Sequence, residues 1–63
     1  MRDWLIAIRE GNGLSQKAVA DAISLAQPSY CTIEKGKTNP SVGTAKKIAA
    51  VLGFDWTRFY EEE

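Results

Sequence analysis

The sequence predicts an all-α fold made of five short helices. Apolar residues recur three and four positions apart in successive segments, which is the spacing of one face of a helix. Glycine, asparagine or proline separates most of these segments, and no segment alternates apolar and polar residues over the length of a strand. With 63 residues, the chain has room for one compact domain, residues 1–63.

The first helix is expected near the N-terminus. Met1, Trp4, Leu5 and Ile8 fall on one stripe of a helix in this segment. The helix is expected to end at residues 11–13, Gly-Asn-Gly, because these residue types tolerate a positive φ. The stripe predicts that this helix buries one side against the rest of the domain.

The second helix is expected to begin after Ser15, whose side chain is suited to an N-cap. Val19, Ala20 and Ile23 fall on its apolar face. Residues 24–26 form a tight turn into the next helix, and the leucine in this turn is expected to reach the core.

The third helix is expected to contain Pro28 in its first turn, where the missing N–H costs little. Tyr30 and Ile33 are its expected inward residues, and Gly36 ends it. Two short helices joined in this way, over about residues 15–35, have the layout of a helix-turn-helix. In that motif the second helix enters the major groove of DNA while the first braces it.

The fourth and fifth helices are expected to begin after Ser41 and Asp55, which are both suited to N-caps. The apolar stripe of the fourth helix consists of Val42, Ala45, Ile48, Ala49 and Leu52. Gly53 closes this helix. Three aromatic residues lie at helical spacing on the fifth: Trp56, Phe59 and Tyr60. The glutamates at 61–63 are expected to fray.

The residue types present argue against an enzyme. Histidine is absent, so no imidazole can act as a general base, and Cys31 has no histidine partner. No metal-ligand cluster or phosphate-binding glycine loop is present, so no cofactor or metal is expected. We interpret Cys31 as a plain small residue, with a redox-active thiol as the alternative. A single cysteine cannot form an internal disulfide, which predicts a reducing, cytoplasmic setting.

Charge is distributed unevenly although the formal net charge is zero. Residues 35–47 contain four lysines and no acidic residue, whereas residues 1–34 and 48–63 sum to −1 and −3. Such a molecule can present a cationic edge to a polyanion while it stays neutral overall. The alternative is that these lysines only keep the surface soluble. No apolar run approaches the ~18 residues of a membrane span, so no membrane partner is expected.

The outward side of the third helix is expected to contact bases. With Tyr30 and Ile33 facing inward, its candidate base-contact residues are Gln27, Pro28, Ser29 and Thr32. A glutamine can hydrogen-bond adenine N6 and N7 together, and a threonine offers a hydroxyl and a methyl group. The alternative is that Gln27 and Thr32 are ordinary solvated residues.

Contacts with the DNA backbone are expected on both sides of that helix. The candidates are Gln16, Lys17, Lys35, Lys37, Thr38 and Asn39. Gln16 stands at the start of the second helix, where free N–H groups can meet a phosphate. The others after the third helix can reach phosphates across the groove.

Arg9 and Glu34 suggest a structural ion pair between the first and third helices. If the pair is partly buried, loss of one partner costs ~3 kcal/mol or more. If it is exposed, the cost is under about 1 kcal/mol. The sequence leaves both possibilities open.

The ordered set of motifs resembles the lambda-repressor-like helix-turn-helix proteins, also called the XRE family. The matching residues run from Leu5 to Tyr60, nearly the whole chain. They include Gly13-Leu14-Ser15-Gln16, Ile33-Glu34-x-Gly36-Lys37 and Asn39-Pro40-Ser41. The resemblance implies a compact five-helix bundle and a transcriptional regulator, often a repressor, that binds an operator as a homodimer. It also implies backbone contacts at Gln16, Lys35 and Lys37, base contacts at Gln27, Pro28 and Thr32, and the Arg9–Glu34 bridge.

Three residues depart from the family pattern. Ser24 occupies the turn position that is usually glycine, so it must accept a less comfortable backbone or shift the turn. Ala26 occupies the cap position of the third helix, which is usually serine or threonine, at a cost of ~1 kcal/mol. Pro28 cannot donate a hydrogen bond to a base. These departures bear on base specificity more than on DNA binding itself.

We therefore expect a sequence-specific regulator, acting as a repressor, that binds double-stranded DNA as a homodimer without a small-molecule ligand. The candidate dimer contacts are Trp56, Phe59 and Tyr60, and the alternative for these aromatics is core filling. A second hypothesis is a protein-interaction module on the same fold, antitoxin-like or a co-regulator, with weak DNA binding. The neutral net charge and acidic C-terminal end favour this second hypothesis.

Overall fold

A computed structural model of the chain describes residues 1–61. Its helices are α1 (Asp3–Gly11), α2 (Gln16–Ala22), α3 (Gln27–Glu34), α4 (Val42–Leu52) and the 3-10 helix η1 (Trp56–Tyr60). The predicted all-α fold with five helical elements is confirmed, and no strand occurs within residues 1–61. The last element is a 3-10 helix rather than an α-helix. The glutamates at 61–63 were expected to fray, and two of them, at 62 and 63, lie outside the described residues.

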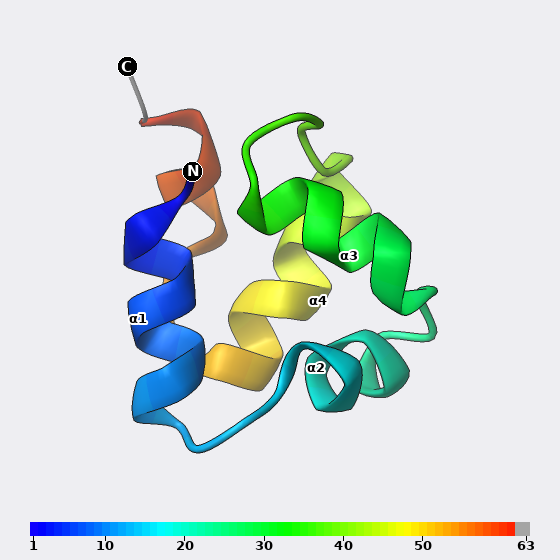
Figure 1. Cartoon of the computed structure of the whole chain (residues 1–63). Coiled ribbons are helices and arrows are strands. Elements are labelled where there is room, and N and C mark those ends of the chain that lie inside the picture. Colours follow the sequence, from blue (N-terminus) through cyan, green and yellow to red (C-terminus); the bar gives the residue numbers. More distant parts are fainter. Residues whose placement is uncertain (62–63) are drawn as a thin grey trace.

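The helices surround α4, which passes through the middle of the molecule (Figure 1). The helix α1 lies on one side of α4, and the pair α2 and α3 lies on the other (Figure 1). The element η1 returns to the beginning of α1, where the rings of Trp4 and Phe59 meet with 5.2 Å between centroids. No helix within residues 1–61 has the length and apolar character needed to cross a bilayer.

The core draws on every helix. Its buried apolar residues are Leu5, Val19, Ala20, Ile23, Tyr30, Ile33, Ala45, Ile48, Ala49, Leu52 and Phe59. Two residues of the expected stripes lie outside it, because Met1 is 78% exposed and Val42 is 48% exposed. Met1 precedes the first residue of α1, so the helical stripe does not extend to it. Val42 is the first residue of α4 and lies at the rim of the domain.

The predicted N-caps are present. Ser15 accepts a hydrogen bond from the Ala18 amide at 3.0 Å. Ser41 accepts one from the Thr44 amide at 3.3 Å. Asp55 accepts one from the Thr57 amide at 3.0 Å, and this bond lowers the pKa of its carboxyl. These bonds fix where α2, α4 and η1 begin.

The turn between α2 and α3 has a strained backbone at Ser24, which is one of the two outcomes that the resemblance left open. Ser24 has φ +58°, and it is the one non-glycine residue with positive φ within residues 1–61. The Leu25 amide bonds to the Ala20 carbonyl at 2.9 Å and the Ser24 amide to the Asp21 carbonyl at 3.2 Å. These two bonds form a Schellman motif, whose left-handed position is usually glycine. Ala26 supplies no side-chain cap to α3, as expected.

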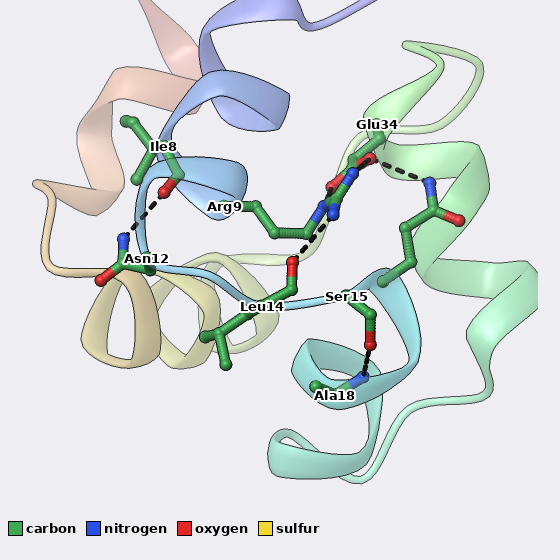
Figure 2. Close-up of polar contacts among 8 residues, drawn as sticks. Ile8, Arg9, Asn12, Leu14, Ser15, Ala18 and Glu34 are labelled. Carbon is green, nitrogen blue, oxygen red and sulfur yellow. Dashed lines mark hydrogen bonds and ion pairs between the residues drawn. The ribbon is translucent and has the colours of Figure 1, made fainter.

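A buried carboxylate joins three helices. Glu34, 1% exposed, accepts hydrogen bonds from Arg9 Nε at 2.6 Å and from Gln16 Nε2 at 2.9 Å. Arg9 also donates from Nη1 to the Leu14 carbonyl at 2.9 Å (Figure 2). The arginine side chain is 11% exposed, so the ion pair is buried. Of the two possibilities that the sequence left open, the structure has the one in which loss of a partner is costly.

The surroundings of this pair lower the pKa of Glu34 and raise the pKa of Arg9, and both shifts favour the charged forms. Burial tends to raise the pKa of Glu34, but hydrogen bonds from Arg9 and Gln16 outweigh it and lower the pKa. The hydrogen bond to Glu34 raises the pKa of Arg9. The ion pair therefore stays intact at neutral pH and weakens only in acid.

Replacement of Ser24 by glycine is expected to raise the free energy of unfolding by about 0.5–1 kcal/mol. The left-handed region costs a residue with a Cβ roughly 1–2 kcal/mol, and the freedom that glycine adds to the unfolded chain offsets part of this gain. Urea denaturation measures the difference. Ser24→Ala keeps the Cβ and serves as the control, and a glycine variant no more stable than this control would contradict the prediction.

Replacement of Glu34 by glutamine is expected to lower the free energy of unfolding by about 3 kcal/mol at neutral pH, because Arg9 loses its buried anionic partner. The folded-state pKa of Glu34 is lowered, so its contribution is present above the unfolded pKa of about 4.3 and is lost as pH falls through the folded pKa. Urea denaturation over a pH series should therefore show the difference between the two proteins shrinking in acid.

The control for this pH series is Asp21→Asn, which removes an exposed carboxylate that pairs with Lys17. Its effect should stay below about 0.5 kcal/mol. A difference between wild type and Glu34→Gln that stays constant down to about pH 3 would rule out the assigned linkage.

Candidate nucleic-acid interface

The outward side of α3 is open to solvent along its first turn. Gln27, Pro28 and Ser29 are exposed, whereas Tyr30 is fully buried and Ile33 is 5% exposed. The helix therefore has the two-sided character that its sequence predicts. Its N-terminal end carries three accessible side chains, the end through which such helices approach base edges.

Thr32 lies one turn further along α3 and is half-buried. Its hydroxyl donates to the Ser29 carbonyl at 2.7 Å and lies 3.1 Å from the hydroxyl of Thr38. Because Thr32 has a single hydroxyl hydrogen, Thr38 is the donor in the second bond. Thr32 thus links α3 to the segment that follows it. Its hydroxyl already makes two hydrogen bonds within the chain before any contact with a base.

The segment 35–39, which we call the basic loop, follows α3 directly. Lys35, Lys37, Thr38 and Asn39 are all exposed in it. The amide of Lys37 bonds to the Thr32 carbonyl at 3.0 Å, which folds the loop back against the end of α3. The exposed loop residues are thereby brought to one end of the helix that carries the base-contact candidates.

The two candidates on α2 already have partners within the chain. Gln16 is half-buried and donates one of its two side-chain amide hydrogens to Glu34, so its side chain reaches solvent less freely than expected. Lys17 forms an exposed pair with Asp21 at 2.9 Å, with both side chains more than 60% exposed (69% and 64%). An exposed pair of this kind is worth under about 1 kcal/mol and can be exchanged for a phosphate.

Arg2 is a residue of this region that sequence reasoning missed. It is 5% exposed, and its guanidinium donates to the carbonyls of Ile33 and Thr38 and to Oδ1 of Asn39. The guanidinium also lies over the Phe59 ring, 5.6 Å from the centroid. No local pattern marks Arg2, since these contacts of its guanidinium reach residues more than thirty positions away along the chain.

The aromatic residues of η1 divide into two groups. Phe59 is 4% exposed and packs against Trp4 and Phe54. It therefore fills the core, which was the alternative to a dimer contact. Trp56 is half-buried and Tyr60 is 51% exposed. Their rings meet edge to face at 5.9 Å. Within η1, these two residues are the ones that leave aromatic surface.

Cys31 is half-buried on α3, and its thiol is free. It lies between the buried Tyr30 and the half-buried Thr32, at the edge of the outward face. This placement agrees with its interpretation as a small residue that packs beside the core.

Relatives of this chain carry the same motif. The sequence profile of the helix-turn-helix family matches residues 5–59. An uncharacterised HTH-type transcriptional regulator, YqaF of Bacillus subtilis, is 45% identical over 62 residues, which are 98% of this chain and 82% of that protein. An uncharacterised HTH-type transcriptional regulator of Haemophilus influenzae is 43% identical over 49 residues, 78% of this chain and 50% of that protein.

The HTH-type transcriptional regulator PuuR of Escherichia coli is 34% identical over 58 residues, which are 92% of this chain and 31% of that protein. This chain thus spans most of the Bacillus protein but about a third of PuuR. No solved structure matches the chain at a significant level. The match to the family profile covers all the helices from Leu5 of α1 to Phe59 of η1. The chain therefore belongs to the XRE-type helix-turn-helix family.

Proposed function

We propose that this protein is a DNA-binding transcriptional regulator that places α3 in the major groove. The observation that carries the proposal is the exposed first turn of α3, with Gln27 at its start and the basic loop at its other end. Gln27, Pro28, Ser29 and Thr32 are the proposed base contacts. The relatives are named as HTH-type transcriptional regulators, which supports the same role here.

The proposed contacts with the DNA backbone come from two sides of α3. On one side are Gln16 and Lys17 at the start of α2, and on the other are the exposed residues of the basic loop. Such contacts set register on the duplex and supply most of the salt-dependent affinity. Gln16 holds Glu34 with one N–H of its side-chain amide, and the second N–H is the donor left for a phosphate.

We further propose that the protein acts as a homodimeric repressor. One copy offers too few phosphate contacts for tight binding at cellular salt, and two copies would read half-sites about 34 Å apart. Trp56 and Tyr60 are the proposed dimer contacts because they keep aromatic surface after the core is filled.

Salt-dependent titration of duplex DNA tests the proposal. Sequences should first be selected from random duplexes, since the recovered spacing reports the half-site geometry. For a dimer with about six phosphate contacts, the plot of log affinity against log salt should have a slope near −5. A flat and weak response, with no sequence recovered, would reject DNA binding and favour a protein-interaction module on the same fold.

Two single substitutions should separate base contacts from backbone contacts. Gln27→Ala is expected to lower discrimination at one base pair by ~1–3 kcal/mol, while Lys37→Ala should weaken all sequences alike and reduce the salt slope by ~1. Both are measured by titration of the selected operator and of a scrambled duplex. The matched control is Lys47→Ala, an exposed lysine on α4. An operator affinity unchanged by both test substitutions would show that another face binds DNA.

A further inference from the structure

The basic loop is held in place from the two ends of the described chain. From the N-terminal end, Arg2 donates to the Thr38 carbonyl at 2.9 Å and to the side chain of Asn39. From the C-terminal end, the Tyr60 hydroxyl donates to the Pro40 carbonyl at 3.2 Å. Residues 38–40, which follow Lys37, are therefore held by the side chains of Arg2 and Tyr60, at least twenty positions away along the chain. Both of these residues lie outside the helix-turn-helix.

Arg2 is suited to this task by the shape of its side chain. The planar guanidinium presents several N–H groups in a fixed fork, and here they reach acceptors on α3 and on the loop together. Burial to 5% exposure and the ring of Phe59 beneath the guanidinium leave it little freedom to move. A lysine would keep the charge but could not serve the same acceptors in this geometry.

We propose that Arg2 and Tyr60 are positioning residues that set the end of the basic loop, together with Pro40 directly after it, for contact with the DNA backbone. The proposal rests on the proposed function, in which Lys37 and its neighbours meet phosphates. It adds that the strength of this contact is controlled by the two ends of the chain rather than by the helix-turn-helix alone.

The physical effect is preorganisation. The amides of Lys37 and Thr38 both bond to the Thr32 carbonyl, at 3.0 and 3.4 Å, so the loop has a single arrangement against the end of α3. Arg2 and Tyr60 hold the other side of the same segment. A loop that is already ordered loses less conformational entropy when it meets a phosphate, which strengthens the contact without adding a new one.

The test compares Arg2→Lys with wild type in salt-dependent titrations of the selected operator. The substitution keeps the charge, so a loss of long-range attraction is not expected. Affinity should fall roughly five- to tenfold and the salt slope should flatten by about 1, the loss of one phosphate contact. Lys37→Ala should have little further effect in the Arg2→Lys background, because the same contact is already lost. Additive effects of the two substitutions would overturn the proposal.

Asn12→Ala is the matched control. Its side chain bonds to the carbonyls of Ile8 and Leu52, at the end of α1 away from the loop (Figures 1 and 2). The substitution removes one local and one long-range hydrogen bond without a change in charge. An equal loss of salt slope in this control would show that Arg2 acts only through overall stability, against the proposal.

Tyr60→Phe provides a milder variant in case Arg2→Lys fails to fold. It removes only the hydroxyl that bonds to Pro40 and keeps the ring. The operator affinity should fall roughly two- to fivefold with the helix content unchanged, about the effect of one hydrogen bond. Wild-type affinity in this variant and in Arg2→Lys would refute the positioning role.

Amide hydrogen exchange in the free protein tests the positioning of the loop without DNA, and so independently of the proposed function. In Arg2→Lys the amides of Lys37 and Thr38 should exchange at least about fivefold faster, while the Leu25 amide in the α2–α3 turn keeps its rate. If the wild type fails to bind DNA but these rates change, the proposed function is wrong and the positioning of the loop is retained. Unchanged rates would overturn the positioning itself.

Discussion

The buried carboxylate of Glu34 ends the helix that carries the base-contact candidates, and it fixes that helix to two others. Its two oxygens take hydrogen bonds from Arg9 on α1 and Gln16 on α2. A buried carboxylate without such donors would be costly, so these three side chains must adopt their positions together. The orientation of α3 relative to α1 and α2 follows from this requirement. Apolar packing alone would leave more freedom, because methyl and ring contacts are less directional than a charged hydrogen bond.

Much of the fold could be predicted because its signals are local. Ser15, Ser41 and Asp55 each cap a helix through a bond to an amide two or three positions away. The apolar spacing of α3 separates buried Tyr30 and Ile33 from the exposed residues of its first turn. For Ser24 the resemblance left two outcomes open, a strained backbone or a shifted turn, and the structure has the first, because the Schellman geometry requires a left-handed residue whatever side chain is present.

What the sequence could not predict depends on contacts between distant segments. Arg2 reads as an ordinary charged residue before the first helix, and only the closed fold brings the loop carbonyls and Phe59 around it. The bond between Thr32 and Thr38 also depends on the way the loop folds back. Spacing on α3 alone placed Thr32 on the outward side and gave no sign of this bond. The burial of the Arg9–Glu34 pair was undecidable for the same reason, since burial is a property of the whole assembly of helices.

The neutral net charge is compatible with binding a polyanion because the cationic side chains differ in their partners within the fold. Arg2 and Arg9 are occupied within the fold, Lys17 pairs with Asp21, and Lys46 and Arg58 lie over the rings of Trp56 and Trp4, at 5.1 and 4.8 Å. Among the residues that the structure describes, the lysines left without an anionic or aromatic partner are Lys35, Lys37 and Lys47. Two of these three belong to the basic loop. The net charge of the whole chain therefore says little about the field next to α3, because Lys35 and Lys37 lie exposed directly after that helix and have no anionic or aromatic partner within residues 1–61.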